Sequence, residues 1–303
     1  MSQPLMKASL LAIAALLLCA CATVPGAAAQ TPIEPTPIAA GESYAFPSEV
    51  YGAARELNVW TPPDYASGAQ RYTVLYLLDG GRDQDFPHIA GLAQLASLSQ
   101  TFGPVIVVGV RSEARQTELT PPPSDARFAR EFPNAGGDAR FRAFLAREVI
   151  PFIESRYRTG ERRALMGESL AGLFVVDTFL SEPALFNDYV AVSPSLWWDE
   201  QAPSRGAAQS LARTRPSGRR LYLTIANEGG ATQSGVDALI AALRGAPAGS
   251  VTWKFVDRSA SETHATILHP AALDALRWLY GVAEPNYGPS PWYYLDPAER
   301  QTH

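Results

Sequence analysis

The chain has 303 residues, of which 47% are hydrophobic, and its formal net charge is −5 at pH 7. This length and apolar content suit one domain with a single large core. The mildly acidic balance and the lack of Lys/Arg runs in the sequence argue against nucleic-acid binding. Both cysteines, Cys19 and Cys21, lie near the N-terminus, so we expect no disulfide inside the folded domain.

Residues 1–29 are predicted to be an export signal. Lys7 precedes residues 8–20, an uncharged apolar run that is short for a bilayer span. Two processing sites remain open. Residues 18–21 (LCAC) resemble a bacterial lipobox in which Cys21 is lipidated, whereas residues 27–29 (AAA) suit a signal peptidase that cleaves after small residues. We therefore expect an exported bacterial protein, either periplasmic or held in the envelope through Cys21.

Beyond a Pro- and Ala-rich linker at residues 30–42, segments that predict strands alternate with helical ones. The early strands are expected at residues 55–60, 72–78 and 105–110. A helix is predicted near residues 89–98. Residues 111–138 are polar and Pro-rich and predict a long loop, of a length typical of a functional lid. A helix is predicted over residues 139–156, with a kink at Pro151.

The strand over residues 72–78 ends in a glycine pair, in the segment Asp79-Gly80-Gly81-Arg82. Glycines there let the backbone approach a substrate oxygen closely. We predict that the N–H of Gly81 donates to the oxyanion of a reacting ester. The alternative is a glycine turn that only reverses the chain.

Ser169 carries the strongest chemical signal in the chain. Residues 167–171 (GESLA) lie between an apolar strand and an apolar helical run, and they match the G-x-S-x-G nucleophile elbow except that Ala171 replaces the last glycine. Such a turn exposes the serine hydroxyl and places the N–H of Leu170 at a helix N-terminus, which favours an oxyanion. We predict Ser169 as the nucleophile and Leu170 as an oxyanion donor. The alternative is a serine that only caps a helix.

A serine nucleophile needs a base, and in sheet hydrolases the order along the chain is Ser, then Asp or Glu, then His. His264 lies in a polar loop between a strand at residues 251–256 and a helix at residues 270–280, from which it would reach back to the elbow. We predict His264 as the base, with a solvated loop histidine as the alternative. His269 precedes Pro270 and is the weaker candidate, because it suits a capping or surface role.

The acid that orients the base is predicted from strand ends. Residues 221–226 form a buried strand that closes in a turn at Glu228, and functional residues of open parallel sheets collect at such ends. We prefer Glu228 as the acid. Asp257, after the following strand, and Asp237, in the next helix, remain alternatives.

Several side chains are candidates to contact the substrate. Arg115 is the preferred one of three arginines in the long loop, with Arg111 and Arg127, that would meet an anionic group. The alternative for each is a solvated surface position. Trp197 and Trp198 follow a strand at residues 189–193 and would line an aromatic cleft or pack a helix into the core.

Apolar strands that alternate with amphipathic helices predict an α/β fold with a mostly parallel sheet covered by helices on both faces. The sequence contains no internal repeat. We expect this one domain to extend over residues 43–283, with a C-terminal tail at residues 284–303.

Five motifs occur in an order that resembles one known group. They are residues 76–80 (YLLDG), 118–121 (ELTP), 166–174 (MGESLAGLF), 193–199 (SPSLWWD) and 263–264 (TH). The chain resembles the "putative esterase" branch of the α/β-hydrolases, which includes ferri-siderophore (enterochelin-type) esterases and, more distantly, S-formylglutathione hydrolase. The resemblance covers about residues 43–281. It implies the α/β-hydrolase fold, ester hydrolysis by Ser169 and His264, and an oxyanion hole built from Gly81 and Leu170.

Other chemistries find no support in the sequence. The four histidines form no H-E-x-x-H motif and the predicted domain has no cysteine ligand, so we expect no zinc site. We expect no cofactor either, because phosphate-loop and dinucleotide fingerprints are missing. The residue three positions after Ser169 is not lysine, which argues against a penicillin-recognising serine enzyme.

The sequence therefore predicts a serine hydrolase that cleaves a small-molecule carboxylic ester through an acyl-enzyme. The resemblance narrows the expected substrate to a catecholate siderophore ester. Two other functions remain open. One is a non-catalytic, ligand-binding protein of the envelope with a hydrolase fold, and the other is an acyltransferase that uses the same three residues.

Overall fold

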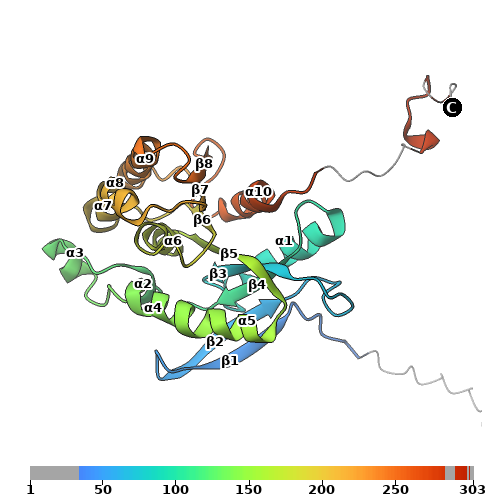
Figure 1. Cartoon of the computed structure of the whole chain (residues 1–303), viewed down its shortest axis with the longest axis horizontal. Helices are drawn as coiled ribbons and strands as arrows, with labels where there is room; N and C mark the ends of the chain where they lie inside the picture. The colour runs from blue at the N-terminus through green and yellow to red at the C-terminus, as the bar shows by residue number, and fades with distance from the viewer. Residues whose placement is uncertain (1–33, 284–290, 299, 301–303) are drawn as a thin grey trace, which may run out of the picture. The chain divides into compact units, whose positions relative to one another are not determined.

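The computed structural model describes residues 34–283, 291–298 and 300 (Figure 1). The predicted export signal, including Cys21, lies outside the described residues. So do residues 30–33 of the predicted linker and part of the predicted tail. The chain from Ala39 onward forms one compact unit, and it contains the candidate site.

Eight strands of the described residues form one sheet in the spatial order β1-β2-β4-β3-β5-β6-β7-β8. Their bounds are β1 (Glu42–Ser48), β2 (Ala53–Trp60), β3 (Tyr72–Leu78), β4 (Val105–Val110), β5 (Thr159–Glu168), β6 (Asp188–Val192), β7 (Arg220–Ile225) and β8 (Thr252–Asp257). β2 is antiparallel to both of its neighbours, β1 and β4, whereas β3 to β8 run parallel. The predicted, mostly parallel sheet is confirmed.

Helices cover both faces of the sheet (Figure 1). On one face, α1 (Phe86–Ser99) and α10 (Leu268–Tyr280) share a buried cluster with Leu75 and Leu77 of β3. On the other face, α6 (Leu170–Ser181) and α9 (Gly230–Gly245) share a second cluster with Val74 and Tyr76 of the same strand. Because successive side chains of a strand point to opposite faces and both faces are covered, the central strands β3 and β4 are buried along nearly their whole length.

The remaining helices surround the sheet or extend its loops. They are α2 (Arg115–Leu119), α3 (Ala126–Glu131), α4 (Asp138–Phe144), the π-helical turn η1 (Leu145–Val149), α5 (Ile150–Arg156), α7 (Trp198–Arg205), α8 (Ala207–Thr214) and the short 3-10 helix η2 (Trp292–Tyr294). No helix within the described ranges has the length and hydropathy of a membrane span.

Several predicted elements need correction. Residues 111–138, expected to be a loop, contain α2 and α3. The helix expected over residues 139–156 is interrupted by η1 just before Pro151, a residue that cannot donate to the helical ladder. β1 begins at Glu42, within the predicted linker, and is an edge strand with mostly exposed side chains.

Two further helices, α7 and α8, have no counterpart among the predicted elements. α7 contains Pro203, and three of its residues have a left-handed backbone, with φ of 47° at Asp199, 54° at Glu200 and 64° at Gln201. The segment therefore lacks the regular apolar spacing from which a helix is predicted.

Parallel pairing brings the carboxyl ends of β5 to β8 to one edge of the sheet. Glu168 of β5 pairs with Val192 of β6, and Val192 pairs with Thr224 of β7. The loops that follow these strands therefore leave the sheet side by side. The predicted nucleophile, acid and base all lie in these loops.

Candidate active site

Ser169 lies at the sharp turn between β5 and α6, with φ of 60° and ψ of −120°. Its N–H donates to Val192 O at 3.0 Å, and its carbonyl accepts from Leu173 N at 2.9 Å. A Cβ at Gly167 would lie 2.6 Å from the Cβ of Ala171, so the turn requires a glycine there. The strained backbone is fixed on both sides and presents the serine hydroxyl at the edge of the sheet.

The alanine at the last position of the elbow motif is compatible with this packing. Ala171 is fully buried against the bare backbone of Gly167. The close approach of α6 to the end of β6 occurs one residue later, where a Cβ on Gly172 would lie 2.9 Å from Val192 O. One methyl group is therefore tolerated at Ala171, because the second tight contact belongs to Gly172.

Leu170 is the first residue of α6, immediately after Ser169. The first N–H groups of a helix have no acceptor within the helix and lie at the positive end of its dipole. The predicted role of Leu170 as an oxyanion donor is compatible with this position and stays a prediction.

Glu228 and His264 lie together. The Nδ1 atom of His264 is 2.6 Å from Oε1 of Glu228, and the Glu228 side chain is 14% exposed against 47% for His264. Burial alone would raise the pKa of Glu228, but hydrogen bonds from Ser193 and His264 outweigh it and hold that pKa below its ordinary value. An ionised carboxylate that accepts the Nδ1–H leaves Nε2 of the imidazole free to act as a base.

The alternative acids and the alternative base make other contacts. Asp257 accepts from the backbone N–H of Ser259, and Asp237 accepts from the side chain of Gln233, both at 2.9 Å. His269, in the first turn of α10, lies 3.2 Å from a ring nitrogen of His88. Of the predicted residues, the structure thus brings together Glu228 and His264.

Ser169 and His264 are not hydrogen-bonded in the described part of the chain. The partner of Ser169 Oγ is instead Ser195 Oγ at 3.3 Å, and Ser195 N donates to Ser169 O at 3.0 Å. His264 also lies near enough to Glu168, the residue before Ser169, to interact with it electrostatically. Contacts between a catalytic serine and its base are often long in the free enzyme and tighten only when substrate binds.

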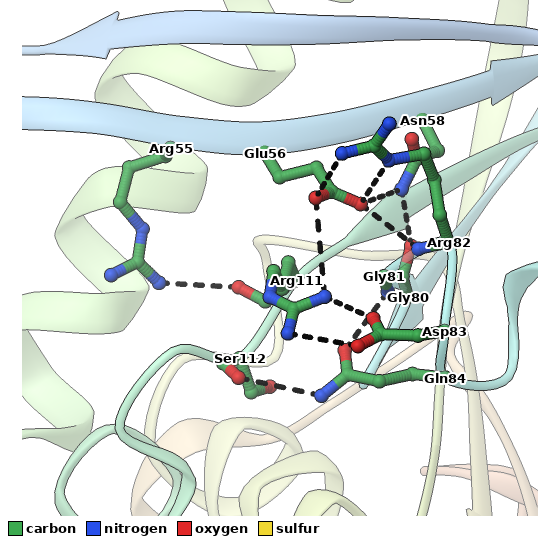
Figure 2. A network of polar contacts seen from close by, with 10 residues as sticks. All are labelled: Arg55, Glu56, Asn58, Gly80, Gly81, Arg82, Asp83, Gln84, Arg111 and Ser112. Carbon is green, nitrogen blue, oxygen red and sulfur yellow. Dashed lines mark hydrogen bonds and ion pairs between the residues drawn. The ribbon is translucent and has the colours of Figure 1, made fainter. Parts of the chain in front are cut away.

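The loop after β3 is held by a polar network (Figure 2). The N–H of Gly81 donates to Oε1 of Gln84 at 2.9 Å, and Nε2 of Gln84 donates to Ser112 O at 3.4 Å. Gly80 packs on the end of β4, where an added Cβ would lie 2.3 Å from the Cα of Gly109. The predicted oxyanion donor Gly81 is therefore engaged by Gln84, and a substrate oxygen would have to displace that carboxamide.

Arg115 lies beside the nucleophile but is ion-paired. Its Nε contacts Asp79 Oδ2 at 2.7 Å, and its Nη2 donates to the carbonyl of Glu168 at 3.3 Å. Burial raises the pKa of Glu168 to about 7, and burial with the nearby Asp79 raises that of Asp85 to about 6. Arg115 thus offsets the negative charge of a carboxyl cluster next to Ser169.

The other two candidate arginines lie in ion pairs. Arg111 pairs with Asp83 and, at 3.9 Å, with Glu56 (Figure 2). Arg127 pairs with Asp125 at 2.9 Å and with Glu200 at 2.8 Å. Any anionic substrate group would compete with these carboxylates.

The two tryptophans differ. Trp198 is 1% exposed, and its indole N–H donates to Pro121 O at 3.2 Å. This burial corrects its assignment to the substrate site, because the indole packs the long loop onto the core. Trp197 is half-buried and, with Phe128 and Phe132 of the same loop region, lines a cavity of about 310 Å³. Whether Trp197 contacts a substrate stays a prediction.

Sequence reasoning missed Ser193, Ser195 and Gln84. Ser193 and Ser195 belong to the SPS segment directly after β6, and their place at a strand's carboxyl end was the available signal. Gln84 gives no signal in the sequence, because its contact with Gly81 depends on how the loop after β3 folds. Within the described residues, no group of three or more His, Cys, Asp or Glu side chains could hold a metal ion.

The fold and the site together define a class of protein. A strained serine after β5, a carboxylate after β7 and a histidine after β8 follow the order expected for an α/β-hydrolase. The chain belongs to the "Putative esterase" family, whose pattern matches residues 48–244. This membership places the protein among the carboxylic ester hydrolases.

Curated relatives carry siderophore esterase names. The ferri-bacillibactin esterase BesA of Bacillus subtilis is 28% identical over 180 residues, covering 55% of this chain and 61% of the relative. The apo-salmochelin esterase of Escherichia coli is 34% identical over 162 residues, covering 47% of this chain and 48% of the relative. The chain thus spans about half to three fifths of the length of these two relatives.

A solved structure agrees with the fold. The IroE-like serine hydrolase from Shewanella oneidensis superposes with a TM-score of 0.71 and 27% sequence identity. The superposition covers 79% of this chain and 80% of that one. It therefore includes most of the catalytic domain.

Proposed function

We propose that this protein hydrolyses carboxylic esters through an acyl-enzyme, with Ser169 as nucleophile, His264 as base and Glu228 as the acid that orients the base. The observation that carries this proposal is the 2.6 Å contact between Glu228 and His264 at the sheet edge that also presents the strained Ser169. The low pKa of Glu228 supports it, since only the ionised carboxylate stabilises an imidazolium.

The reaction follows from these positions. Nε2 of His264 takes the proton of Ser169 as Oγ bonds to the ester carbon, and the carbonyl electrons move onto its oxygen. The N–H groups of Leu170 and, after Gln84 moves, Gly81 would hold that oxyanion. The imidazolium then returns the proton to the departing alcohol. A water repeats the sequence on the acyl-enzyme, which releases the acid and restores Ser169.

We propose a siderophore ester as the substrate. The names of the curated relatives support this assignment. Trp197 lies two residues after Ser195, whose Oγ contacts that of Ser169, and with Phe128 and Phe132 it forms a half-buried aromatic surface that suits a planar ring.

The test is steady-state hydrolysis of short-chain nitrophenyl esters and of ferric and iron-free catecholate trilactones. We expect Ser169→Ala and His264→Ala each to lower kcat by about 10⁴- to 10⁶-fold. Ser181→Ala, an exposed serine at the other end of α6, is the matched control and should retain full activity. Activity of Ser169→Ala equal to that of the control would overturn the assignment. If the protein cleaves simple esters but not the trilactones, the proposal of a siderophore substrate is wrong and the esterase assignment stands. Formation of a new ester when an alcohol is added would indicate an acyltransferase.

We further propose that the protein is exported and attached to the bacterial envelope through lipid on Cys21. The support is the sequence, in which Lys7, the apolar run at residues 8–20 and the LCAC motif follow one another. In cells fed a tagged fatty acid, the wild-type protein should carry label in the membrane fraction and Cys21→Ser should not. Label-free wild-type protein in the periplasm would indicate cleavage after the alanines at residues 27–29 instead.

A further inference from the structure

Ser193 is a buried hydroxyl that the reaction scheme does not use. It is the first residue after β6 and is 0% exposed. Its Oγ accepts from the N–H of Ala226 at 3.1 Å and contacts Oε1 of Glu228. It therefore contacts the same carboxylate oxygen of the predicted acid as His264 does.

The direction of these bonds is fixed by the donors available. A backbone amide can only donate, so the Ala226 N–H uses one lone pair of Ser193 Oγ. The single hydroxyl hydrogen of Ser193 is then free for Glu228, whose ionised carboxylate can only accept. The chain of contacts runs from Ala226 N–H to Ser193, and from the Ser193 O–H to Glu228.

Both donors to Glu228 meet on one oxygen. Oε1 receives the Ser193 hydroxyl and the His264 Nδ1–H, whereas Oε2 is buried and has no hydrogen-bond partner among the described residues. Without the Ser193 hydroxyl, only the contact with the imidazole of His264 would remain of these two. That exposed, movable ring would then be the only one of the two donors to distinguish Oε1 of Glu228 from Oε2. The hydroxyl thus determines which oxygen faces the base.

The backbone at Ser193 is consistent with a selected role for the hydroxyl. Its φ is 39°, in the left-handed region that glycine adopts without strain. Its N–H donates to Thr224 O at 3.0 Å, which ties this strained residue to β7. A serine kept at a position where glycine would be less strained indicates that the side chain is needed.

We propose that Ser193 is a positioning residue that holds the Glu228 carboxylate in the orientation in which it receives the N–H of His264. This inference rests on the proposed function, because it assumes that Glu228 orients a catalytic base. Ser193 acts through Glu228 and does not itself contact the substrate. A hydrogen bond to a charged group in a buried site is among the stronger ones in proteins, so its loss should be measurable.

Two substitutions separate the hydroxyl from the backbone. Ser193→Ala removes the hydroxyl and retains the strained Cβ, whereas Ser193→Gly removes both the hydroxyl and the strain. We expect both variants to lower kcat by about 10- to 100-fold and to leave KM within about twofold. Their Tm values should differ, with Ser193→Gly the more stable of the two. Full activity in either variant would overturn the proposal.

A double-mutant cycle tests whether Ser193 works through Glu228. In a Glu228→Gln background the carboxylate is already lost, so adding Ser193→Ala should change kcat by less than about twofold. A second full loss of activity in that background would mean that Ser193 acts by another route and would contradict the proposal.

A proton NMR measurement tests the role of Ser193 independently of whether the protein hydrolyses esters. We expect a downfield proton NMR signal from the His264 Nδ1–H in the wild type, its loss in Glu228→Gln, and its broadening or shift in both Ser193 variants. An unchanged signal in Ser193→Ala would overturn the positioning role even if the protein proves to be an esterase. An active Ser169→Ala variant would overturn the esterase assignment. The NMR signal of the His264 Nδ1–H would then still test whether Ser193 positions Glu228.

Discussion

At the scale of single residues, strain accompanies the candidate chemistry. Asp79, Ser169 and Ser193 directly follow β3, β5 and β6, and their φ values are 50°, 60° and 39°. Each left-handed non-glycine residue costs on the order of 1–3 kcal/mol. Contacts with neighbouring strands hold these residues, as the bond from Ser169 N to Val192 O shows. Three of the eight non-glycine residues with positive φ in the described part of the chain therefore lie at the strand ends beside the proposed nucleophile and acid.

The role of Glu228 can be tested by removing its charge alone. Glu228→Gln keeps the shape of the side chain but cannot stabilise an imidazolium, so kcat should fall by about 10³- to 10⁴-fold. Asp257→Asn and Asp237→Asn are matched controls and should retain kcat within about twofold. If Asp257→Asn loses activity and Glu228→Gln does not, the acid has been misassigned.

The raised pKa of Glu168 should make the stability of the folded protein depend on pH. Burial raises its pKa from 4.5 to about 7, so between these pH values the folded protein keeps a proton that the unfolded chain releases. The contribution of Glu168 to stability is therefore lost as pH rises through 7. Glu168→Gln should raise the Tm more at pH 8 than at pH 5, with about 2–4 °C expected per kcal/mol.

Thermal unfolding at the two pH values is the measurement. Glu161→Gln replaces an exposed glutamate of the same strand, β5, and should shift the Tm little at either pH. A Glu168→Gln effect that is equal at pH 5 and pH 8, or that lowers the Tm at pH 8, would contradict the assignment of a raised pKa.

At the scale of elements, the sequence predicts the regular parts of the fold well. The parallel strands and α6 have long apolar segments with clear ends, and they lie where the sequence places them. β1, α7 and the short helices of the long loop were missed because their stability comes from neighbours. Phe128 of α3 and Phe132, directly after α3, pack on Trp198, with ring centroids 5.8 and 5.1 Å from that of the indole.

The same distinction applies to the candidate site. The sequence predicts Ser169, Glu228 and His264, because each follows a recognisable strand, and the structure places Glu228 and His264 in contact. Ser193 and Ser195 stand at a strand's carboxyl end, but their contacts join different loops and, like that of Gln84 with Gly81, do not follow from the local pattern. The hydrogen bond from the Gly81 N–H to Gln84 is one such contact between side chain and loop, and it occupies the N–H predicted to hold the oxyanion.

The loop after β3 predicts a gain of activity. Gln84→Ala removes the acceptor that engages the Gly81 N–H, so a substrate oxygen no longer has to displace it. If Gly81 serves the oxyanion hole, kcat/KM should rise by about 2- to 10-fold. Arg82→Ala alters the exposed side chain of the same loop and should have no effect. A fall in kcat/KM for Gln84→Ala alone would mean that Gln84 supports the loop instead.

At the scale of the whole molecule, one buried carboxylate connects four elements. Asp188 of β6 is 0% exposed and contacts Arg162 of β5 and Arg220 of β7, each at 2.6 Å, and Tyr280 of α10 at 2.7 Å. Burial alone would raise the pKa of Asp188, but hydrogen bonds from Arg220, Arg162 and Tyr280 outweigh it and lower that pKa. The group lies at the amino ends of the strands, away from the candidate site.

We therefore expect substitution of Asp188 to lower the stability of the fold and to leave kcat unchanged. Asp188→Asn leaves two partly exposed arginines without their buried carboxylate, and it should lower the free energy of unfolding by roughly 1–3 kcal/mol at pH 7. Because the folded-state pKa is lowered, this stabilisation is present above the ordinary carboxyl pKa and is lost as pH falls through the lowered value.

Urea unfolding at pH 7 and at about pH 2 measures this effect, and the difference in the free energy of unfolding between the wild type and Asp188→Asn should narrow at about pH 2. The kcat of the folded variant should match that of the wild type. Asp64→Asn, at an exposed carboxylate, should leave the stability almost unchanged. A stable but inactive Asp188→Asn variant would contradict the separation of this cluster from the site.

The proposed function requires that His264 activate Ser169 as a nucleophile. Treatment of the folded protein with a fluorophosphonate, followed by intact mass and peptide mapping, measures this reactivity. We expect one adduct, on Ser169, that is lost in Ser169→Ala and forms far more slowly in His264→Ala. An adduct on the neighbouring Ser195, or folded wild-type protein that takes no label, would contradict this requirement.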